Sequence, residues 1–331
     1  MSTAGASERI PGALRERLSD AVSQLAAAGA LIVVFVLLAI VSPDFLTANN
    51  LFNIGVQAAV TAVIGVGMTL VIITAGIDLS VGSVAALAGI IGVSSMVSLG
   101  FPPFLAILVG VLTGVATGLI NGFLVSVANL NPFIATLGML SAARGLTFVS
   151  SEGQAVFATE ESFRLFGQGE IASIPVPIIA LVLVAVAGHI VLTRTRLGRY
   201  AYAIGSNREA ARLSGIPVRR YVGLVYVISG ALAGLGGMIA ASRVFSGQPN
   251  YGTGLELDVI AAVVIGGASL FGGQGTIVGT LIGAFLIALI RNGSVLLDVN
   301  LFYQQIIIGV VIWLAVYWDQ FRRRRIAASS G

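Results

Sequence analysis

The sequence predicts an all-α, polytopic membrane protein with about ten transmembrane helices and both termini in the cytoplasm. Of the 331 residues, 57% are hydrophobic and 10% are charged, whereas soluble domains carry about 25% charged residues. Residues 1–25, 151–173, 194–220 and 319–325 hold 24 of the charged residues, which comprise 18 basic and 14 acidic side chains in all. The rest of the chain is too apolar for a water-soluble surface, so we expect a multi-pass protein of the cell membrane.

Ten apolar segments are long enough to cross a bilayer, which requires about 20 helical residues. They are residues 22–42, 54–75, 80–98, 103–127, 132–150, 174–193, 221–241, 256–271, 275–291 and 301–318. The first lacks a convincing cleavage site for a signal peptide and is expected to stay as a span. The expected regions are a cytoplasmic amphipathic tail at 1–25, a transmembrane domain at 26–318 and an arginine-rich cytoplasmic tail at 319–331.

The arginines predict the orientation of these spans. With ten spans, the N-terminal tail, residues 194–220 and Arg322 to Arg325 all lie on one side and hold 14 of the 18 basic residues, whereas the opposite loops hold Arg164 and Arg243. An excess of basic residues marks the cytoplasmic side of a membrane protein. Both termini and residues 194–220 are therefore predicted to be cytoplasmic.

Missing residue types exclude several activities. The chain has no lysine and no cysteine, and its one histidine is His189. A phosphate-loop ATPase needs lysine, and thiolate chemistry or a disulfide needs cysteine. We expect no catalytic residue, no metal and no cofactor. The net charge of +4 comes from arginines at span ends, so no nucleic-acid partner is expected.

Small residues dominate two spans and predict close helix packing. The runs Gly110 to Gly118 and Gly230 to Gly237 are rich in Gly, with Ala in both and Thr in the first. In lipid, small residues let two helix backbones approach each other. Both runs are expected to be contact faces.

Two segments resemble each other. Gly76-Ile77-Asp78-Leu79-Ser80-Val81 precedes the third span, and Gly254-Leu255-Glu256-Leu257-Asp258-Val259 precedes the eighth. Five spans separate them, so the two repeats would be inverted, as in many transporters. The match covers six positions and is also compatible with chance.

Polar residues in and near the spans suggest a solute path. Asp78 and Ser80 could instead cap a helix, because amides and the helix dipole favour a carboxylate there. An ionisable group within the membrane is costly, however, and usually faces protein or water. The candidate path residues are Asp78, Ser80, Ser83, Asn121, Asn131 and Thr136.

Residues 194–220 predict a short cytoplasmic helix. Ser206 and Glu209 have the spacing of a capping box, Gly215 favours the end of the helix, and Pro217 prevents its continuation. This helix could dock a partner protein. It could also lie on anionic lipid, which the seven arginines of this segment would permit.

The segment Glu209-Ala210-Ala211 with Gly215 resembles the coupling loop by which importer permeases of the ATP-binding-cassette (ABC) class contact their ATPase. Longer blocks resemble permeases for ribose, xylose, arabinose and galactosides. They are Gly67 to Ser83, Asn131 to Gly138, Ala210 to Ile216 and Gly266 to Thr276. The resemblance runs from about residue 45 to 320 and so spans most of the chain.

The resemblance implies a permease subunit of an ABC importer for a pentose, hexose or related polyol. It implies a separate ATPase, an extracytoplasmic sugar-binding protein and a second permease copy or paralogue, all assembled in the lipid bilayer. The coupling role would fall on Ser206, Glu209, Ala210, Ala211 and Gly215. A permease for nucleosides, autoinducer-2 or branched-chain amino acids is an alternative, and an ion-coupled secondary transporter is a more remote one.

Overall fold

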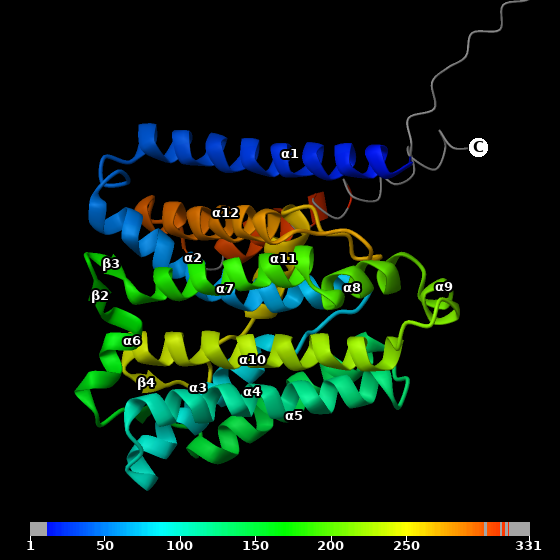
Figure 1. Ribbon diagram of the computed structural model, residues 1–331. Coiled ribbons are helices and arrows are strands. Elements are labelled where there is room, and N and C mark those ends of the chain that lie inside the picture. The colour runs from blue at the N-terminus through cyan, green and yellow to red at the C-terminus, as the bar shows by residue number, and fades with distance from the viewer. Residues whose placement is uncertain (1–11, 301–302, 312, 315–316, 318–331) are drawn as a thin grey trace, which may run out of the picture.

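The computed structural model describes residues 12–300, 303–311, 313–314 and 317, and most of these residues are helical (Figure 1). Eight helices contain stretches long and apolar enough to cross a membrane. They are α1 (Gly12–Val41), α2 (Ala48–Ile73), α3 (Val81–Leu99), α4 (Pro103–Ser126), α5 (Pro132–Ser151), α7 (Val176–Arg194), α10 (Val218–Val244) and α12 (Ile277–Leu296). The predicted all-α membrane fold is confirmed.

The shorter elements lie mainly at the two ends of the bundle. One end carries α8 (Arg196–Ser206) and α9 (Arg208–Leu213), and we call it the α9 end. The other end, called the α6 end, carries α6 (Arg164–Gln168) and β1 to β4 (Figure 1). The remaining short elements are η1 (Glu161–Phe163), β1 (Val156–Phe157), β2 (Glu170–Ile171), β3 (Ile174–Pro175), β4 (Ser246–Gly247) and α11 (Leu255–Ile265). The strands form two antiparallel pairs, β1 with β4 and β2 with β3.

The prediction of a continuous span at 256–271 is wrong. The helix there, α11, has only 11 residues, which is about 16 Å of helix and half the hydrocarbon thickness. Gly267, Gly272, Gly273 and Gly275 have positive φ angles, so the backbone after α11 follows a path that is not helical. Irregular backbone at membrane depth is tolerated where it is buried in protein.

The chain nevertheless crosses the bundle at α11. The α11 and α12 backbones touch in antiparallel order, with Gly266 against Gly279 and Ala262 against Gly283. The following loop reaches the α9 end, where the Gly273 N–H donates to the Ile73 carbonyl over 2.9 Å. The nine crossings predicted up to α12 are thus retained, with the short α11 and its following loop making the eighth. The predicted tenth span, 301–318, lies partly outside the described residues, although residues 303–311 are helical.

The two similar segments precede helices that run in opposite directions. Contacts of α3 with α10, such as Ala85 with Gly237, place its C-terminal end toward the α6 end. Its antiparallel contact with α12 directs α11 toward the α9 end. This opposite orientation is what an inverted repeat requires.

The predicted contact faces of small residues meet. A Cβ atom added to Gly114 of α4 would collide with the Gly230 carbonyl of α10, and one added to Gly118 would lie 2.5 Å from the Tyr226 carbonyl. Such distances are shorter than van der Waals contact, so the two helix backbones touch along these glycines. Among the eight long helices, α2 is the most buried, since 89% of the residues in its 18-residue apolar stretch are buried. It packs on α7, α10, α11 and α12.

Candidate functional site

Asp78 lies in the turn between α2 and α3 at the centre of a closed polar cluster. Its Oδ1 accepts hydrogen bonds from the Ser80 Oγ (2.6 Å) and the Ser80 N–H (3.1 Å), and its Oδ2 accepts one from Ser229 Oγ (2.9 Å). The Ser80 hydroxyl also accepts a bond from Asn121 Nδ2 (2.9 Å). Asp78, Ser80 and Asn121 are each 1% exposed and Ser229 is fully buried. We call these four residues the Asp78 cluster.

Hydrogen bonds replace a counter-charge in this cluster. None of the ion pairs between described residues includes Asp78. A buried carboxylate is tolerated only where its lone pairs are satisfied, and three donors do so here. Through them, Asp78 and Ser80 connect the start of α3 to α4 and α10.

The backbone next to Asp78 is held as well. The Ile77 carbonyl accepts a hydrogen bond from the Tyr226 hydroxyl (3.2 Å). The Thr136 hydroxyl lies 2.9 Å from the Pro132 carbonyl and 3.4 Å from the Ile77 carbonyl, and its one hydrogen is shared between these two acceptors. The turn before α3 is therefore fixed to α5 and α10. The Thr136 hydroxyl thus faces the backbone carbonyl of Ile77, the residue before Asp78.

Two other predicted path residues lie apart from these bonds. Ser83 is buried in α3, and its hydroxyl has no hydrogen-bond partner within the described part of the chain. Asn131 is exposed and caps α5 by accepting the Phe133 N–H over 2.9 Å. The structure therefore brings Asp78, Ser80 and Asn121 together, with Thr136 beside them, but leaves Asn131 at a helix terminus.

The capping alternative for Asp78 and Ser80 is not what the structure shows. Ser80 stands before α3 but makes no side-chain capping bond. Asp78 accepts from the N–H two residues ahead, which is an Asx-turn, and uses its second oxygen to reach α10. The carboxylate thus bonds across helices.

The second of the two similar segments carries an ion pair. Asp258 in the first turn of α11 pairs with Arg291 of α12 at 2.5 Å, and the Asp258 side chain is 8% exposed. Nearby, Arg144 of α5 donates to the carbonyls of Pro249 and Tyr251, both at 2.8 Å. These arginines bind the irregular segment 248–254 and α11 to the long helices.

A cavity of about 490 Å³ opens beside this ion pair. Its walls carry the charged residues Arg243, Asp258 and Arg291 together with Gln57, Thr61, Gln248, Tyr251 and Thr253. The cavity lies between α2, α10, α11 and α12, toward the α6 end. Ligand sites for small molecules usually measure about 300–1,000 Å³, so a monosaccharide fits its size.

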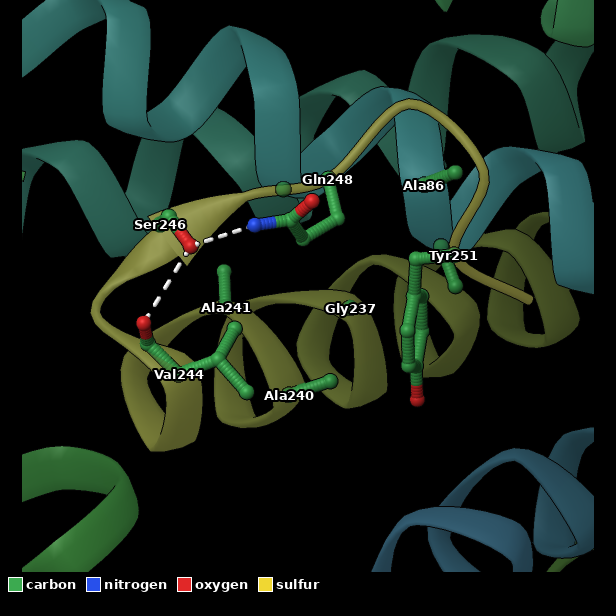
Figure 2. Close-up of a pocket in the computed structure, with 10 residues that line it drawn as sticks. Ala86, Gly237, Ala240, Ala241, Val244, Ser246, Gln248 and Tyr251 are labelled. Atoms are coloured by element: carbon green, nitrogen blue, oxygen red, sulfur yellow. Dashed lines mark hydrogen bonds between the residues drawn. The ribbon is translucent and has the colours of Figure 1, made fainter. Parts of the chain in front are cut away.

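A narrow recess adjoins the cavity. Figure 2 shows it between α10 and residues 246–251, where Gln248 Nε2 donates to Ser246 Oγ (2.8 Å) and Ser246 donates to the Val244 carbonyl (3.2 Å). Its volume is about 10 Å³, which is room for about one water molecule. Gln248 and Tyr251 line both spaces, so we treat the recess as a side branch too small for a solute.

None of the six predicted path residues lines the cavity. One signal in the sequence could have located it. Arg243 and Arg291 are among the four arginines outside the predicted cytoplasmic clusters. A charged residue in or near a span usually faces a polar cavity or a partner of opposite charge. Gln57, Thr61 and Gln248 have no comparable signal, because isolated polar residues are common in spans of a large bundle.

At the α9 end, the coupling segment differs from the prediction in its cap. Ser206 is the last residue of α8, and Asn207 caps α9 by accepting the Ala210 N–H at 2.9 Å. Asparagine is as good a cap as serine. The prediction that Ser206 caps this helix is therefore wrong by one residue. The amphipathic helix α8 was missed altogether.

The predicted end of the short helix is confirmed. Gly215 has a φ of +81°, its N–H donates to the Arg212 carbonyl, and the Ile216 N–H donates to the Ala211 carbonyl. These two bonds form a Schellman motif, for which glycine is preferred. The helix therefore ends sharply at Ser214 and Gly215.

The exposed face of α9 combines charge with small side chains. Glu209 pairs with Arg212 at 2.6 Å, with side chains 66% and 64% exposed. The hydrogen bond from Arg212 lowers the pKa of Glu209 below its usual value. Ala210 and Gly215 are also exposed, whereas Ala211 is buried against the bundle. The Leu213 side chain is 74% exposed, so α9 offers an unusual apolar contact at the tip of the molecule.

The described residues contain no group of three or more His, Cys, Asp or Glu side chains placed to hold a metal ion. The ionisable residues of the cavity pair with each other or stand singly.

Comparisons with known proteins show similarity to transport permeases. Residues 50–316 match the family described as branched-chain amino acid transport system, permease component. The chain is 46% identical over 292 residues to the ribose import permease protein RbsC of Bacillus subtilis (strain 168), covering 88% of this chain and 90% of that protein. It is 41% identical over 281 residues to the D-allose transport system permease protein AlsC of Escherichia coli (strain K12), covering 84% and 86%. It is also 37% identical over 294 residues to the L-arabinose ABC transporter permease protein AraH of Azospirillum brasilense, covering 89% and 86%.

Proposed function

Because the chain belongs to the family of branched-chain amino acid transport system permease components, we propose that it forms the membrane path of an ABC importer for a sugar. The relatives named for ribose, D-allose and L-arabinose support this solute class. The observation that carries the proposal is the exposed, capped helix α9 at the arginine-rich end of a multi-pass bundle. A projecting helix suits docking of a separate ATPase.

We assign three partners. An ATPase with two nucleotide-binding modules would bind α9, since this chain has no lysine for a phosphate loop. An extracytoplasmic sugar-binding protein would deliver the solute at the α6 end. A second permease copy or paralogue would complete the path. This chain would hydrolyse no ATP itself.

The docking contacts are assigned to Glu209, Ala210, Ala211 and Gly215, with Ser206 at the base of α9. The exposed Ala210 and Gly215 leave room for the groove of a partner to approach the α9 backbone. The Glu209–Arg212 ion pair stabilises the single turn and a half of helix. Ala211 packs inward and transmits the position of α9 to the bundle.

The solute path is assigned to the cavity and the Asp78 cluster in series. Ala240 on the cavity wall and Ser229 in the cluster lie on the same helix, α10, about 16 Å apart along its axis. The cavity lies toward the α6 end, which is the predicted outer side, whereas Asp78, Ser80, Asn121 and Ser229 are almost completely buried. We infer an outward-facing state with its inner barrier at Asp78, Ser80, Asn121 and Thr136.

The cavity lining favours a neutral polyhydroxylated solute. Amide groups of Gln57 and Gln248 and the hydroxyls of Thr61, Tyr251 and Thr253 can both donate and accept hydrogen bonds, as sugar hydroxyls do. The wall also carries the apolar residues Val60, Ala240, Val244 and Leu255, so the preference for a sugar over a branched-chain amino acid rests on the relatives named for sugars. A nucleoside or autoinducer-2 shares the hydroxyl chemistry and remains the alternative within this class.

The test is transport by the reconstituted complex. The permease, its ATPase and its binding protein would be placed in liposomes, and uptake of radiolabelled D-ribose, D-allose and L-arabinose measured with and without ATP. We expect ATP-dependent uptake of at least one of these sugars. Uptake that persists without ATP and disappears when the proton gradient collapses would instead identify an ion-coupled secondary transporter.

A further inference from the structure

The end of α8 is packed against two other segments without any side chain between them. A Cβ atom added to Gly205 would collide with the Ile73 carbonyl and lie 2.5 Å from the Gly273 nitrogen. Real Cβ atoms do not come so close to backbone atoms. Gly205 therefore brings the backbone of α8 into direct contact with the end of α2 and with the loop between α11 and α12.

The loop between α11 and α12 completes this contact. The Gly273 N–H donates to the Ile73 carbonyl (2.9 Å), and the Tyr202 hydroxyl donates to the Gly275 carbonyl (2.7 Å). A Cβ atom added to Gly272 would lie 2.8 Å from the Cβ of Ala75. We call Tyr202, Gly205, Ser206, residues 272–275 and residues 73–75 the glycine joint.

The joint lies between the two functional regions of the chain. On one side, only Asn207 separates α8 from α9. On the other side, Ala75 is three residues from Asp78, and its φ of +60° fixes a sharp turn at the end of α2. The Ile77 carbonyl and the Asp78 carboxylate are then bonded to α5, α3 and α10 as described above.

We propose that the glycine joint transmits displacement of α9 to the Asp78 cluster as a rigid contact, with Gly205, Gly273 and Tyr202 as positioning residues for transport. The proposal rests on the assignment of α9 as the ATPase-docking helix. Backbone-to-backbone contact leaves no rotatable side chain to absorb movement. A shift of α8 therefore has to move Ile73 and the turn that leads to Asp78.

A wedge in the joint should uncouple ATP hydrolysis from transport. Gly205→Ala forces α8 away from Ile73, and Tyr202→Phe removes the hydroxyl that donates to the Gly275 carbonyl. In the reconstituted complex we expect Gly205→Ala to retain the ATPase subunit and its basal hydrolysis while sugar molecules imported per ATP fall at least tenfold. Tyr202→Phe should lower the same ratio severalfold. The matched control is Gly145→Ala, because nothing lies within 4 Å of a Cβ at that helical position.

A reversible cross-link tests rigidity directly. The chain has no native cysteine, so cysteines introduced at positions 206 and 273 would be its only thiols. A Cβ atom at position 273 would lie 2.7 Å from Ser206 Oγ and 3.3 Å from Ser206 Cα, which is closer than a relaxed disulfide requires, and Gly273 has a φ of +76°. The activity of the reduced double variant is therefore measured first. In the double variant Ser206→Cys/Gly273→Cys, oxidation should change uptake by less than about twofold relative to the reduced form. A loss of uptake on oxidation that reductant restores would overturn the proposal, because the contact would then have to open. If the reduced double variant is itself inactive, the ratios for Gly205→Ala and Tyr202→Phe decide.

Failure of the joint is distinguishable from failure of the docking assignment. If a bulky residue at Gly215 abolishes uptake but Gly205→Ala keeps the wild-type ratio of uptake to hydrolysis, the glycine joint is wrong and α9 still docks the ATPase. If both variants transport normally, the docking assignment is wrong. Loss of the ATPase subunit from the Gly205→Ala complex would also overturn the joint, since Gly205 would then act in docking.

Discussion

The Ser229 hydroxyl donates a 2.9 Å hydrogen bond to Asp78 Oδ2 and thereby fastens α10 to the turn before α3. The two residues are 151 positions apart in sequence, and both are almost completely buried. The bond holds the middle of α10 and the turn before α3 in one arrangement. If the path runs through this cluster as proposed, transport requires that arrangement to change, so the bond should matter for both stability and activity.

Substitution of Asp78 should test this bond first. Asp78→Ala leaves the Ser80 and Ser229 hydroxyls without their acceptor, and we expect a loss of about 2–4 kcal/mol in stability together with loss of uptake. Asp78→Asn keeps the shape and one acceptor oxygen and should cost less. Thermal unfolding in detergent and uptake by the reconstituted complex measure the two effects. Wild-type uptake by Asp78→Ala would remove Asp78 from the path.

The α9 helix should tolerate little change on its exposed face. Replacement of Gly215 by Val places a branched side chain at a φ of +81°, a conformation that β-branched residues avoid, and it blocks close approach of a partner. We expect the ATPase to dissociate from the permease and uptake to fall to background, while the amount of permease in the membrane is unchanged. Co-purification of the two subunits is the measurement. Gly138→Ala serves as the control, because that position has open space around it.

The Glu209–Arg212 pair makes the α9 turn sensitive to acid. The pKa of Glu209 is lowered in the folded protein by the hydrogen bond from Arg212, so its stabilising contribution is present above the usual pKa and is lost as pH falls through the lowered value. Hydrogen exchange of the α9 amides, corrected for its intrinsic pH dependence, should be constant from about pH 8 to 5.5 and accelerate below about pH 4. In Glu209→Gln the acceleration should be absent. An unchanged profile in that variant would assign the acid sensitivity to another group.

The ion pair on the cavity wall should show strong coupling. Asp258 is largely buried, and Asp258→Asn removes the negative charge that pairs with Arg291. We therefore expect the protein to be destabilised by about 1–3 kcal/mol. Arg291→Met in the same chain should recover part of this loss, because no unpaired charge remains. A double-mutant cycle on thermal unfolding measures the coupling. Strictly additive effects would show that the pair contributes nothing beyond its separate side chains.

The glycine contact between α4 and α10 should be intolerant of even one methyl group. Gly114→Ala would push a Cβ atom into the Gly230 carbonyl, so we expect about 1–3 kcal/mol of destabilisation from overpacking. The same change at Gly138 should be neutral or slightly stabilising, since alanine favours helix. Melting temperatures of the two variants provide the comparison. Equal melting temperatures would show that the two backbones can separate without cost.

The fold class and most spans could be predicted from the sequence, because hydropathy acts over whole segments. The cytoplasmic orientation predicted from the arginines stays a prediction. The prediction of spans failed where glycines decided the backbone. Residues 256–271 are apolar enough for a span, but glycines with positive φ end α11 after 11 residues. Hydropathy cannot distinguish a buried irregular segment from a lipid-facing helix, since both are apolar.

The site was predictable only in part. Asp78, Ser80 and Asn121 were identified because charged and amide groups in spans are rare, and the structure places them in one cluster. Ser229 was missed, since a serine in a small-residue helix looks like a packing residue. The shift of the α9 cap from Ser206 to Asn207 shows that neighbouring residues with equal capping ability cannot be separated by pattern alone.

The touching backbones of α4 and α10 have a mechanical consequence. No side chain separates Gly114 of α4 from Gly230 of α10. Because backbone atoms cannot move aside as side chains do, the two helices should behave as one rigid unit. On the proposed path, alternation would use contacts made by longer aliphatic side chains, such as Ile178 of α7 against Gly55 of α2 and Leu38 of α1 against Gly293 of α12. The α4–α10 pair would then stay fixed while other helices of the membrane domain move against it.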